Sequence, residues 1–292
     1  MNDLAPITID PATFLRQHCV LPALPHVVHQ IQEMIHSDTV EIPKIVDILK
    51  GDPSLVAQIL KIVNSAYYGI PKEVSEVRFA IAFLGLNEVY RMVLSLSVIN
   101  TLSIEDKQEL DRFWFHSFYA AICTKHLARK FAQHLSFEEL WSAAILHDIG
   151  KLVYLKFYPA HYHILIKHAT ETGCMFSEAE SHFGYPSSAY MGSLLCDHWR
   201  LPGKVKDACK RHGLVCLMES QSDSLTDDFT RMICMGNLMA IMSVGERSDD
   251  TNRNIASTIR AKLQYNESEF LALMGEIYDL RGDADKFMGQ FI

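Results

Sequence analysis

Apolar residues recur along this 292-residue chain at intervals of three and four, the spacing that places side chains on one face of an α-helix. The segment after LPALP (21–25) is an early example, with apolar positions at Val27, Val28, Ile31, Met34 and Ile35. Alternating strand patterns bounded by Asn-Gly or Asp-Gly turns are absent from the sequence. The sequence therefore predicts an all-α protein.

Helix start and stop signals divide the first third of the chain. In EIPKIVDILKGDPSLVAQILKIVNSAYYG, Pro43 and Pro53 stand where a first helical turn tolerates proline, and Asp52 is a good N-cap. These signals predict helices over 43–50 and 53–64. A further apolar stretch at 74–102 is expected to form two helices, because Gly85 interrupts it.

The rest of the chain continues the helical pattern after a polar break at 103–111. Ser136 and Glu139 have the spacing of a capping box, which predicts one helix running to Phe157 before Pro159 stops it. A polar stretch at 219–228 is expected to be a linker or long loop. The other predicted helices are 113–133, 160–172, 177–182, 187–199, 203–212, 229–243, 252–264 and a last one capped by Asn266.

Composition narrows the class of protein. Hydrophobic residues make up 49% and charged residues 21%, so the chain is expected to fold as an ordinary globular protein. The formal net charge of −8 has the wrong sign for binding a phosphate backbone. Neither a signal peptide nor a run of about 18 uncharged apolar residues is present, so we expect a cytoplasmic protein that is not in a membrane. Seven cysteines without a CxxC pair are expected to be free and mostly buried.

The decapeptide AAILHDIGKL (143–152) carries the main candidate chemistry, in His147, Asp148 and Lys151. A neutral imidazole beside a carboxylate suits a divalent cation. Adjacent residues on a helix point about 100° apart, so both reach one ion only at a helix end or in a crevice between helices. His116 lies in a segment expected to pack antiparallel to this one, and we expect it to be a third ligand.

A structural interpretation competes with the metal site. A His-Asp pair in a helical protein is commonly a helix end, and Lys151 is of a type common on solvated helix faces. The sequence provides no way to assemble the remaining candidate histidines into the site, namely His161, His163, His168, His182, His198 and His212.

Five motifs together resemble the HDOD domains, the HD-related output domains of bacterial signalling proteins, within the HD superfamily of metal-dependent phosphohydrolases. They occur in the same order as in that family, and the resemblance covers about residues 15–215. The motifs are LPALP at 21–25, GDPSLVAQILKIVNSAYYG at 51–69, AIAFLGL at 80–86, HDIGKLVY at 147–154 and DHWRLP at 197–202.

The resemblance implies an HD-type helical bundle with an N-terminal helical subdomain. On this basis residues 1–14 are a leader and residues 15–218 are the HDOD domain, with parts at 15–105 and 106–218. Residues 219–292 are expected to add C-terminal helices that complete the bundle.

Matched to the superfamily, His116 is the first histidine, and His147 and Asp148 are the pair that would hold a metal. Lys151 matches a lysine that lies near the substrate phosphate in the HD-GYP phosphodiesterase branch. The last aspartate of the pattern is replaced by Asn237, whose neutral amide is a weaker ligand than a carboxylate.

Two further departures leave the two-metal set of that branch incomplete. Ser188 stands where many relatives carry a histidine. Arg211-His212-Gly213 stands where the phosphodiesterases have paired histidines, so His212 is not included among the expected ligands.

Three functional hypotheses follow. The first is a non-enzymatic regulatory or output module of bacterial signal transduction, with a degenerate metal pocket, that acts through a signalling protein partner or a nucleotide-type small ligand. The second is a metal-dependent phosphohydrolase of nucleotides or cyclic dinucleotides, with Asp148 and Lys151 catalytic. Both allow one divalent metal, with Mn, Mg, Fe and Ni as candidates, and both allow a homodimer.

The third hypothesis is DNA binding through the helices 43–50 and 53–64, whose short joint resembles a helix-turn-helix. The second of these helices offers only Gln58, Lys61 and Asn64 as polar contacts. Together with the negative charge, this makes nucleic acid an unexpected partner.

Overall fold

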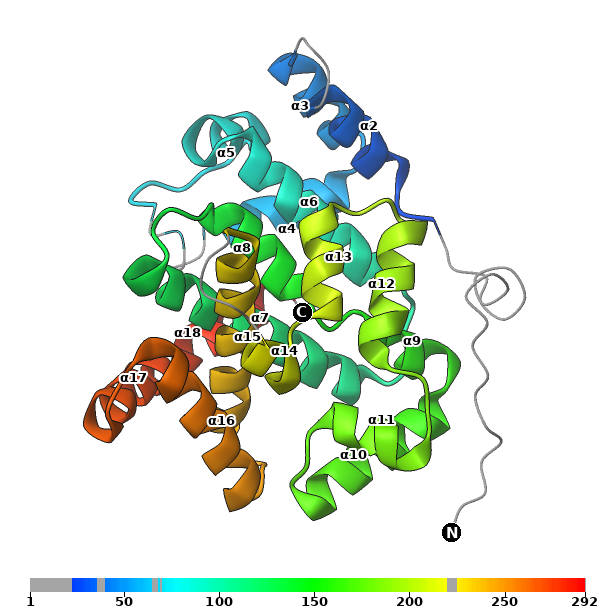
Figure 1. The fold of residues 1–292 in the computed structure, drawn as a ribbon. Helices are drawn as coiled ribbons and strands as arrows, with labels where there is room; N and C mark the ends of the chain where they lie inside the picture. The colour runs from blue at the N-terminus through cyan, green and yellow to red at the C-terminus, as the bar shows by residue number, and fades with distance from the viewer. Residues whose placement is uncertain (1–22, 36–39, 65–67, 69, 220–224, 292) are drawn as a thin grey trace. The chain divides into compact units, whose positions relative to one another are not determined.

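The structure, a computed structural model, describes residues 23–35, 40–64, 68, 70–219 and 225–291. The predicted leader at 1–14 lies outside these residues, as does Cys19. Within the described residues the secondary structure is helical, with no strand (Figure 1). This confirms the predicted all-α class.

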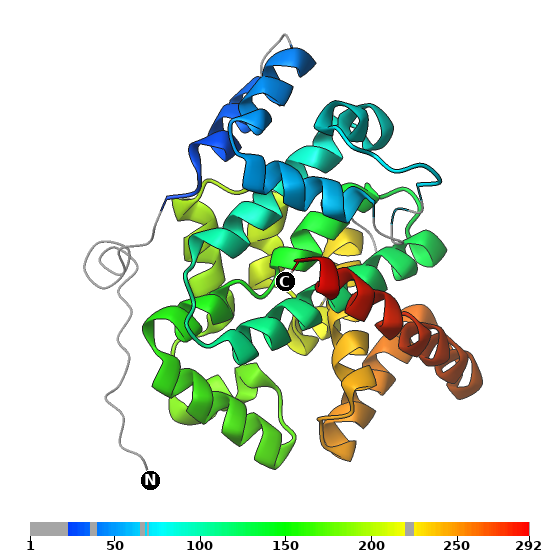
Figure 2. The same cartoon turned by 180° about the vertical axis from the view of Figure 1, so that it is seen from behind.

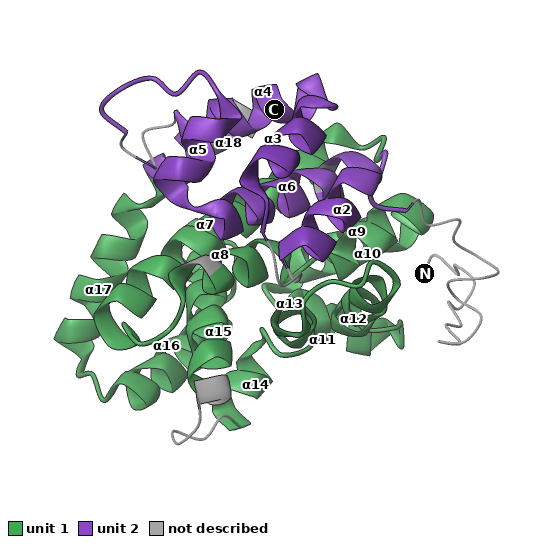
Figure 3. Cartoon of the chain, turned by 90° about the horizontal axis from the view of Figure 1, so that it is seen from above, with its two compact units in different colours: residues 1–21, 104–281 green, residues 22–103, 282–292 purple. Residues whose placement is uncertain are grey.

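Two compact units divide the chain, and each is described by itself (Figure 3). Unit 2 contains residues 22–103 and 282–292, and unit 1 contains residues 104–281 together with 1–21. The helices of unit 2 are α2 (His26–Ile35), α3 (Ile42–Lys50), α4 (Pro53–Val63), α5 (Val77–Leu84), α6 (Leu86–Thr101) and, from its second residue on, α18 (Arg281–Phe291), red in Figure 2.

Unit 2 follows the predicted helix signals closely. Asp52 caps α4 by accepting a hydrogen bond from the Leu55 N–H at 3.0 Å. Gly85 separates α5 from α6 with a φ of +90°, a conformation that favours glycine. Asn64, one of the polar residues in the DNA-binding hypothesis, uses its side chain to bond both the N–H and the carbonyl of Val74. The Asn64 side chain therefore stabilises the fold of unit 2 through the Val74 backbone.

Unit 1 is built around the long helix α7. Its other helices are α8 (Phe137–Leu146), α9 (Gly150–Phe157), α10 (Pro159–Thr172), α11 (Phe176–Phe183), α12 (Ser188–His198), α13 (Gly203–Lys210), α14 (Leu214–Glu219), α15 (Leu225–Val244), α16 (Asp249–Leu263) and α17 (Glu267–Asp279). α7 (Lys107–Phe131) packs against α8 and α15, and α9 packs against α12. Figure 1 shows α7, α8 and α15 side by side.

α7 begins earlier than the sequence predicted. The polar stretch 103–111 was expected to be a break, but Asp106 accepts a hydrogen bond from the Glu109 N–H at 3.1 Å and caps the helix. The first turn is polar, and apart from Glu109 the buried residues of α7 begin at Phe113. Periodicity alone detects only that buried part.

The helix predicted from Ser136 to Phe157 is wrong as a single element, because it is broken at the His-Asp pair. α8 ends at Leu146 and α9 begins at Gly150, and the turn between them holds His147 and Asp148. Backbone bonds three residues apart tighten this turn, including the bond from the Lys151 N–H to the Asp148 carbonyl at 2.8 Å. The break allows two adjacent side chains to point into the same interior space.

The start of α12 is held by a buried carboxylate. Glu180, which is 2% exposed, accepts a hydrogen bond from the Ser188 N–H at 2.7 Å. Burial raises the pKa of Glu180 to about 7, against the opposing effects of the Ser188 bonds and Lys151.

We expect this carboxyl to make stability depend on pH. Because its folded pKa lies above the ordinary value, the folded state holds a proton that the unfolded state releases between about pH 4.5 and 7. The free energy of unfolding should therefore fall by on the order of 2 kcal/mol from pH 5 to pH 8 through this group. Glu180→Gln should remove that fall in urea unfolding, whereas Glu171→Gln, at an exposed position, should keep it. Equal pH slopes in wild type and Glu180→Gln would contradict the assignment.

The six described cysteines are free, as predicted, and four of them, Cys123, Cys196, Cys209 and Cys234, are buried. No single described helix is long and apolar enough to cross a bilayer. One bent pair, α5 with the Leu86–Val98 part of α6, meets the length and composition criteria when taken together.

Candidate metal centre

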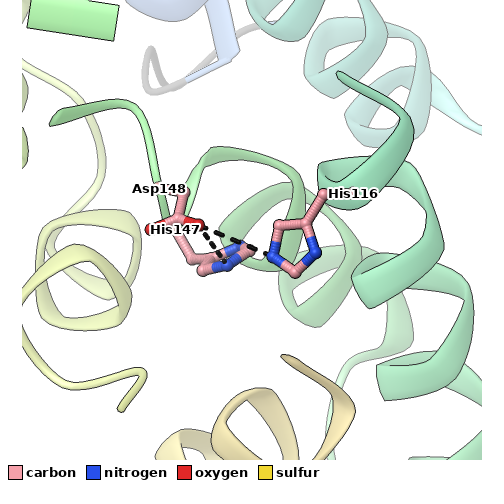
Figure 4. Close-up of side chains that lie close together, drawn as sticks. All are labelled: His116, His147 and Asp148. Atoms are coloured by element: carbon pink, nitrogen blue, oxygen red, sulfur yellow. Dashed lines mark ion pairs between the residues drawn. The ribbon is translucent and has the colours of Figure 1, made fainter. Parts of the chain in front are cut away.

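The turn between α8 and α9 faces α7 at His116, and three side chains meet there (Figure 4). The Asp148 Oδ2 atom lies 3.3 Å from His147 Nε2 and 3.5 Å from His116 Nε2. One ligand atom from each residue lies within 4.8 Å of the others. The structure therefore brings together the three residues that the sequence proposed, while their role as metal ligands stays a prediction.

These polar atoms are buried without the hydrogen bonds that burial ordinarily requires. His147 is 1% exposed and Asp148 is 2% exposed. The Nε2 atoms of His116 and His147 and the Oδ1 atom of Asp148 have no hydrogen-bond partner. Such atoms cost free energy unless something binds them, and a cation would satisfy them together.

The orientation of His147 fits a ligand. Its Nδ1 lies 2.6 Å from the carbonyl oxygen of Ala144. A carbonyl can only accept, so Nδ1 carries the hydrogen and the lone pair is on Nε2, which faces Asp148. Metal-binding histidines are commonly oriented by this kind of bond from the other ring nitrogen.

Lys151 is a partner of the site. Its Nζ lies 2.6 Å from Asp148 Oδ2 and 5.0 Å from the centre of the Phe176 ring. The side chain is only 19% exposed. The interpretation of Lys151 as a solvated helix residue is therefore wrong.

Two pKa shifts describe the electrostatics of the pocket. Burial lowers the pKa of His116 to about 3, although Asp148 opposes this shift, so its imidazole is neutral at ordinary pH. Burial alone raises the pKa of Asp148, but the positive charge of Lys151, the largest opposing effect, holds it well below its usual range. The pocket therefore presents a neutral imidazole and an ionised carboxylate, the forms that bind metal.

His212 also lies in the pocket, although the sequence did not predict it as a member of the site. It follows α13, and its Nε2 lies 3.1 Å from Asp148 Oδ1, the oxygen opposite the one that faces His116. The rings of His147 and His212 are 4.9 Å apart between centroids. Its alignment with the paired histidines of the phosphodiesterases was the available signal, but the neighbouring arginine and glycine obscured it.

Asn237 reaches the same region from α15 and is 2% exposed. Its Nδ2 donates a hydrogen bond to the His212 carbonyl at 3.0 Å, and its side chain also interacts by hydrogen bonding with His116. An ionised aspartate could not donate this bond. Ser188, the other departure from the expected pattern, lies at the start of α12 with its N–H bonded to Glu180.

The described donor set fits one divalent ion better than two. It contains imidazole nitrogens and one carboxylate, which suit first-row divalent metals. The positive Lys151 offsets the single negative charge of Asp148. Two dications without further carboxylates would therefore leave a large buried positive charge.

Comparisons with known proteins agree with this architecture. The HDOD domain family model matches residues 21–214. A protein of Treponema pallidum is 24% identical over 192 residues, which are 66% of this chain. The chain spans 37% of the length of that relative.

Solved structures show the same fold at low sequence identity. A protein of Shewanella amazonensis, provisionally named a phosphohydrolase, has a TM-score of 0.70 at 23% identity, with 96% of this chain and 98% of that chain covered. An HDOD domain protein of unknown function from Geobacter sulfurreducens has a TM-score of 0.70 at 20% identity, with 95% and 96% covered. A protein of Marinobacter aquaeolei, provisionally named a signal transduction protein, has a TM-score of 0.69 at 18% identity, with 93% and 60% covered. By its family match, its helical fold and its motifs, the chain belongs to the HDOD domain family.

Proposed function

We propose that this chain is a regulatory module of bacterial signal transduction whose HD-type pocket binds one divalent metal ion. It would act by binding a signalling protein or a nucleotide-type small ligand. The family match and the provisional name of the Marinobacter relative support the signalling role. A metal in the pocket would stabilise the junction of α7 with the segments that follow α8 and α13, because His116, His147 and His212 all face Asp148. Asn237 of α15 joins this junction through its hydrogen bond to the His212 carbonyl.

The observation that carries the regulatory proposal is the hydrogen bonding and neutral charge of Asn237. Where the superfamily pattern has a carboxylate, this residue donates its side-chain N–H to the His212 carbonyl and brings no negative charge. Asp148 is the only carboxylate of the described metal cluster, and Lys151 already pairs with it. A single carboxylate that is already paired with Lys151 balances less positive charge than the two metal ions of a two-metal hydrolysis mechanism carry.

A second function, metal-dependent phosphoester hydrolysis, has support from one specific contact. Lys151 lies at the metal cluster, where its ammonium could contact a substrate phosphate after releasing Asp148. The metal, when bound, would supply an activated water, while Lys151 would neutralise phosphate charge and Asp148 would orient the ion. The provisional name of the Shewanella amazonensis relative also points to this chemistry.

Metal content and turnover separate the two functions. The chain should be purified without chelator, its metals measured by elemental analysis, and hydrolysis of nucleotides and cyclic dinucleotides measured with Mn²⁺, Mg²⁺ and Ni²⁺. The regulatory proposal expects about one metal per chain and no turnover above that of Asp148→Asn. Turnover that requires Asp148 would favour the hydrolase. Absence of both metal and turnover would contradict any metal-dependent role.

A further inference from the structure

We infer that His212 is a ligand of the same metal ion, so that three histidines and Asp148 form the site. This inference rests on the proposed metal pocket and adds His212, which faces the Oδ1 atom of Asp148, as a further ligand. It also predicts which metals bind.

The tautomer of His212 is fixed by the end of α13. Its Nδ1 lies 3.1 Å from the Ala208 carbonyl oxygen and 3.0 Å from the Cys209 carbonyl oxygen. Both of these atoms can only accept hydrogen bonds, so Nδ1 carries a hydrogen. In the neutral ring the Nε2 atom therefore has a lone pair, as it does in His147.

That lone pair faces an atom that also cannot donate. His212 Nε2 is 3.1 Å from Asp148 Oδ1, which is buried and has no hydrogen-bond partner. Two acceptors at this distance repel each other unless a positive charge, either a second proton on the His212 ring or a bound cation, lies between or beside them. Lys151 provides such a charge to Oδ2, the other carboxylate oxygen. A metal ion held by Asp148 would supply it to Oδ1 and would also lie beside His147, whose Nε2 is 3.3 Å from Asp148 Oδ2.

The surrounding helices hold His212 in this position. Its backbone carbonyl accepts the hydrogen bond from Asn237 at 3.0 Å, and its side chain is only 14% exposed. Outer contacts of this kind orient ligands at metal sites. Asn237 is therefore a positioning residue for the ligand that replaces the missing carboxylate.

Three imidazoles and one carboxylate make a nitrogen-rich site. Mg²⁺ prefers a shell of oxygen ligands, whereas Fe²⁺, Co²⁺, Ni²⁺ and Zn²⁺ accept imidazole readily. The inference therefore predicts that these transition metals bind much more tightly than Mg²⁺.

The test measures metal binding by the intact chain without an activity assay. Zn²⁺, Co²⁺ and Mg²⁺ are titrated calorimetrically into chelator-treated wild type, His212→Ala and His198→Ala, and the visible absorption of the Co²⁺ forms is recorded. His198 is an exposed histidine at the end of α12 and serves as the matched control. Loss of one nitrogen ligand should weaken Zn²⁺ and Co²⁺ binding by at least about tenfold and change the Co²⁺ spectrum. The control should match wild type.

The outcomes distinguish the inference from the proposed function. Wild type that binds no metal would overturn both. Wild type that binds Zn²⁺ or Co²⁺, with His212→Ala binding equally and giving the same spectrum, would overturn only the role of His212. Circular dichroism and thermal melting check that the variant is folded. If the alanine variant unfolds, His212→Gln carries the same test, because its side-chain N–H can still reach the carbonyls at the end of α13.

Discussion

Asp148→Asn is expected to abolish metal binding, lowering the metal content from about one ion per chain to below about 0.1 by elemental analysis. The substitution keeps the shape of the side chain and removes the only carboxylate of the described metal cluster. Asp148 is also the residue that the other groups share, since His116, His147, Lys151 and His212 all face its two oxygens. A neutral amide there leaves the ion without a negative ligand beside the positive Lys151.

The control for this experiment is Asp207→Asn, which removes an exposed carboxylate from α13. It should retain the metal content of wild type. Circular dichroism should show both variants folded at 25 °C. A full complement of tightly bound metal in Asp148→Asn would contradict the assignment of this carboxylate to the site.

Gly150→Ala is expected to destabilise the fold by at least about 3 kcal/mol, or to prevent soluble expression. A Cβ atom at this position would lie 1.8 Å from the Ser188 carbonyl oxygen and 2.5 Å from the Gly192 nitrogen. Both are backbone atoms of α12, so relief requires α9 and α12 to separate. Gly150 begins α9 two residues after Asp148, and its missing side chain lets the metal turn lie against α12.

Gly275→Ala is the matched control, because Gly275 lies within α17 and nothing stands within 4 Å of an added Cβ. Alanine in a helix interior is about 0.5–1 kcal/mol more favourable than glycine, so this variant should be slightly stabilised. Urea unfolding monitored by circular dichroism measures both changes. A Gly150→Ala variant as stable as wild type would show that α9 and α12 do not pack as closely as the structure indicates.

Gly236 has a similar role on the other side of the pocket. Its Cβ would lie 2.1 Å from Thr124 Oγ1 and 2.7 Å from the Thr124 nitrogen, so glycine lets α15 lie directly against α7. The next residue, Asn237, thereby reaches the His212 carbonyl. Two close backbone approaches thus set the position of groups on either side of Asp148.

The sequence alone determined the helical class, because the apolar spacing and helix caps are local signals. Asp52 and Gly85 act in the structure as their residue types predict. The sequence also identified His116, His147 and Asp148 as neighbours, because the family motif preserves their spacing. These conclusions need only side-chain chemistry and the order of residues.

Only the tertiary structure decided how the pocket is built. The break at His147 leaves no clear local signal, since the apolar residues of α8 and α9 read as one helix, yet it directs two adjacent side chains inward. His212 joins the site because α13 ends beside the turn, a matter of packing between segments distant in sequence. Asn237 looked like a weakened ligand in the sequence, whereas its hydrogen bond shows that it holds His212. Local sequence patterns indicate where a helix begins and which of its faces is buried. Which side-chain atoms surround one carboxylate depends instead on how whole helices pack together.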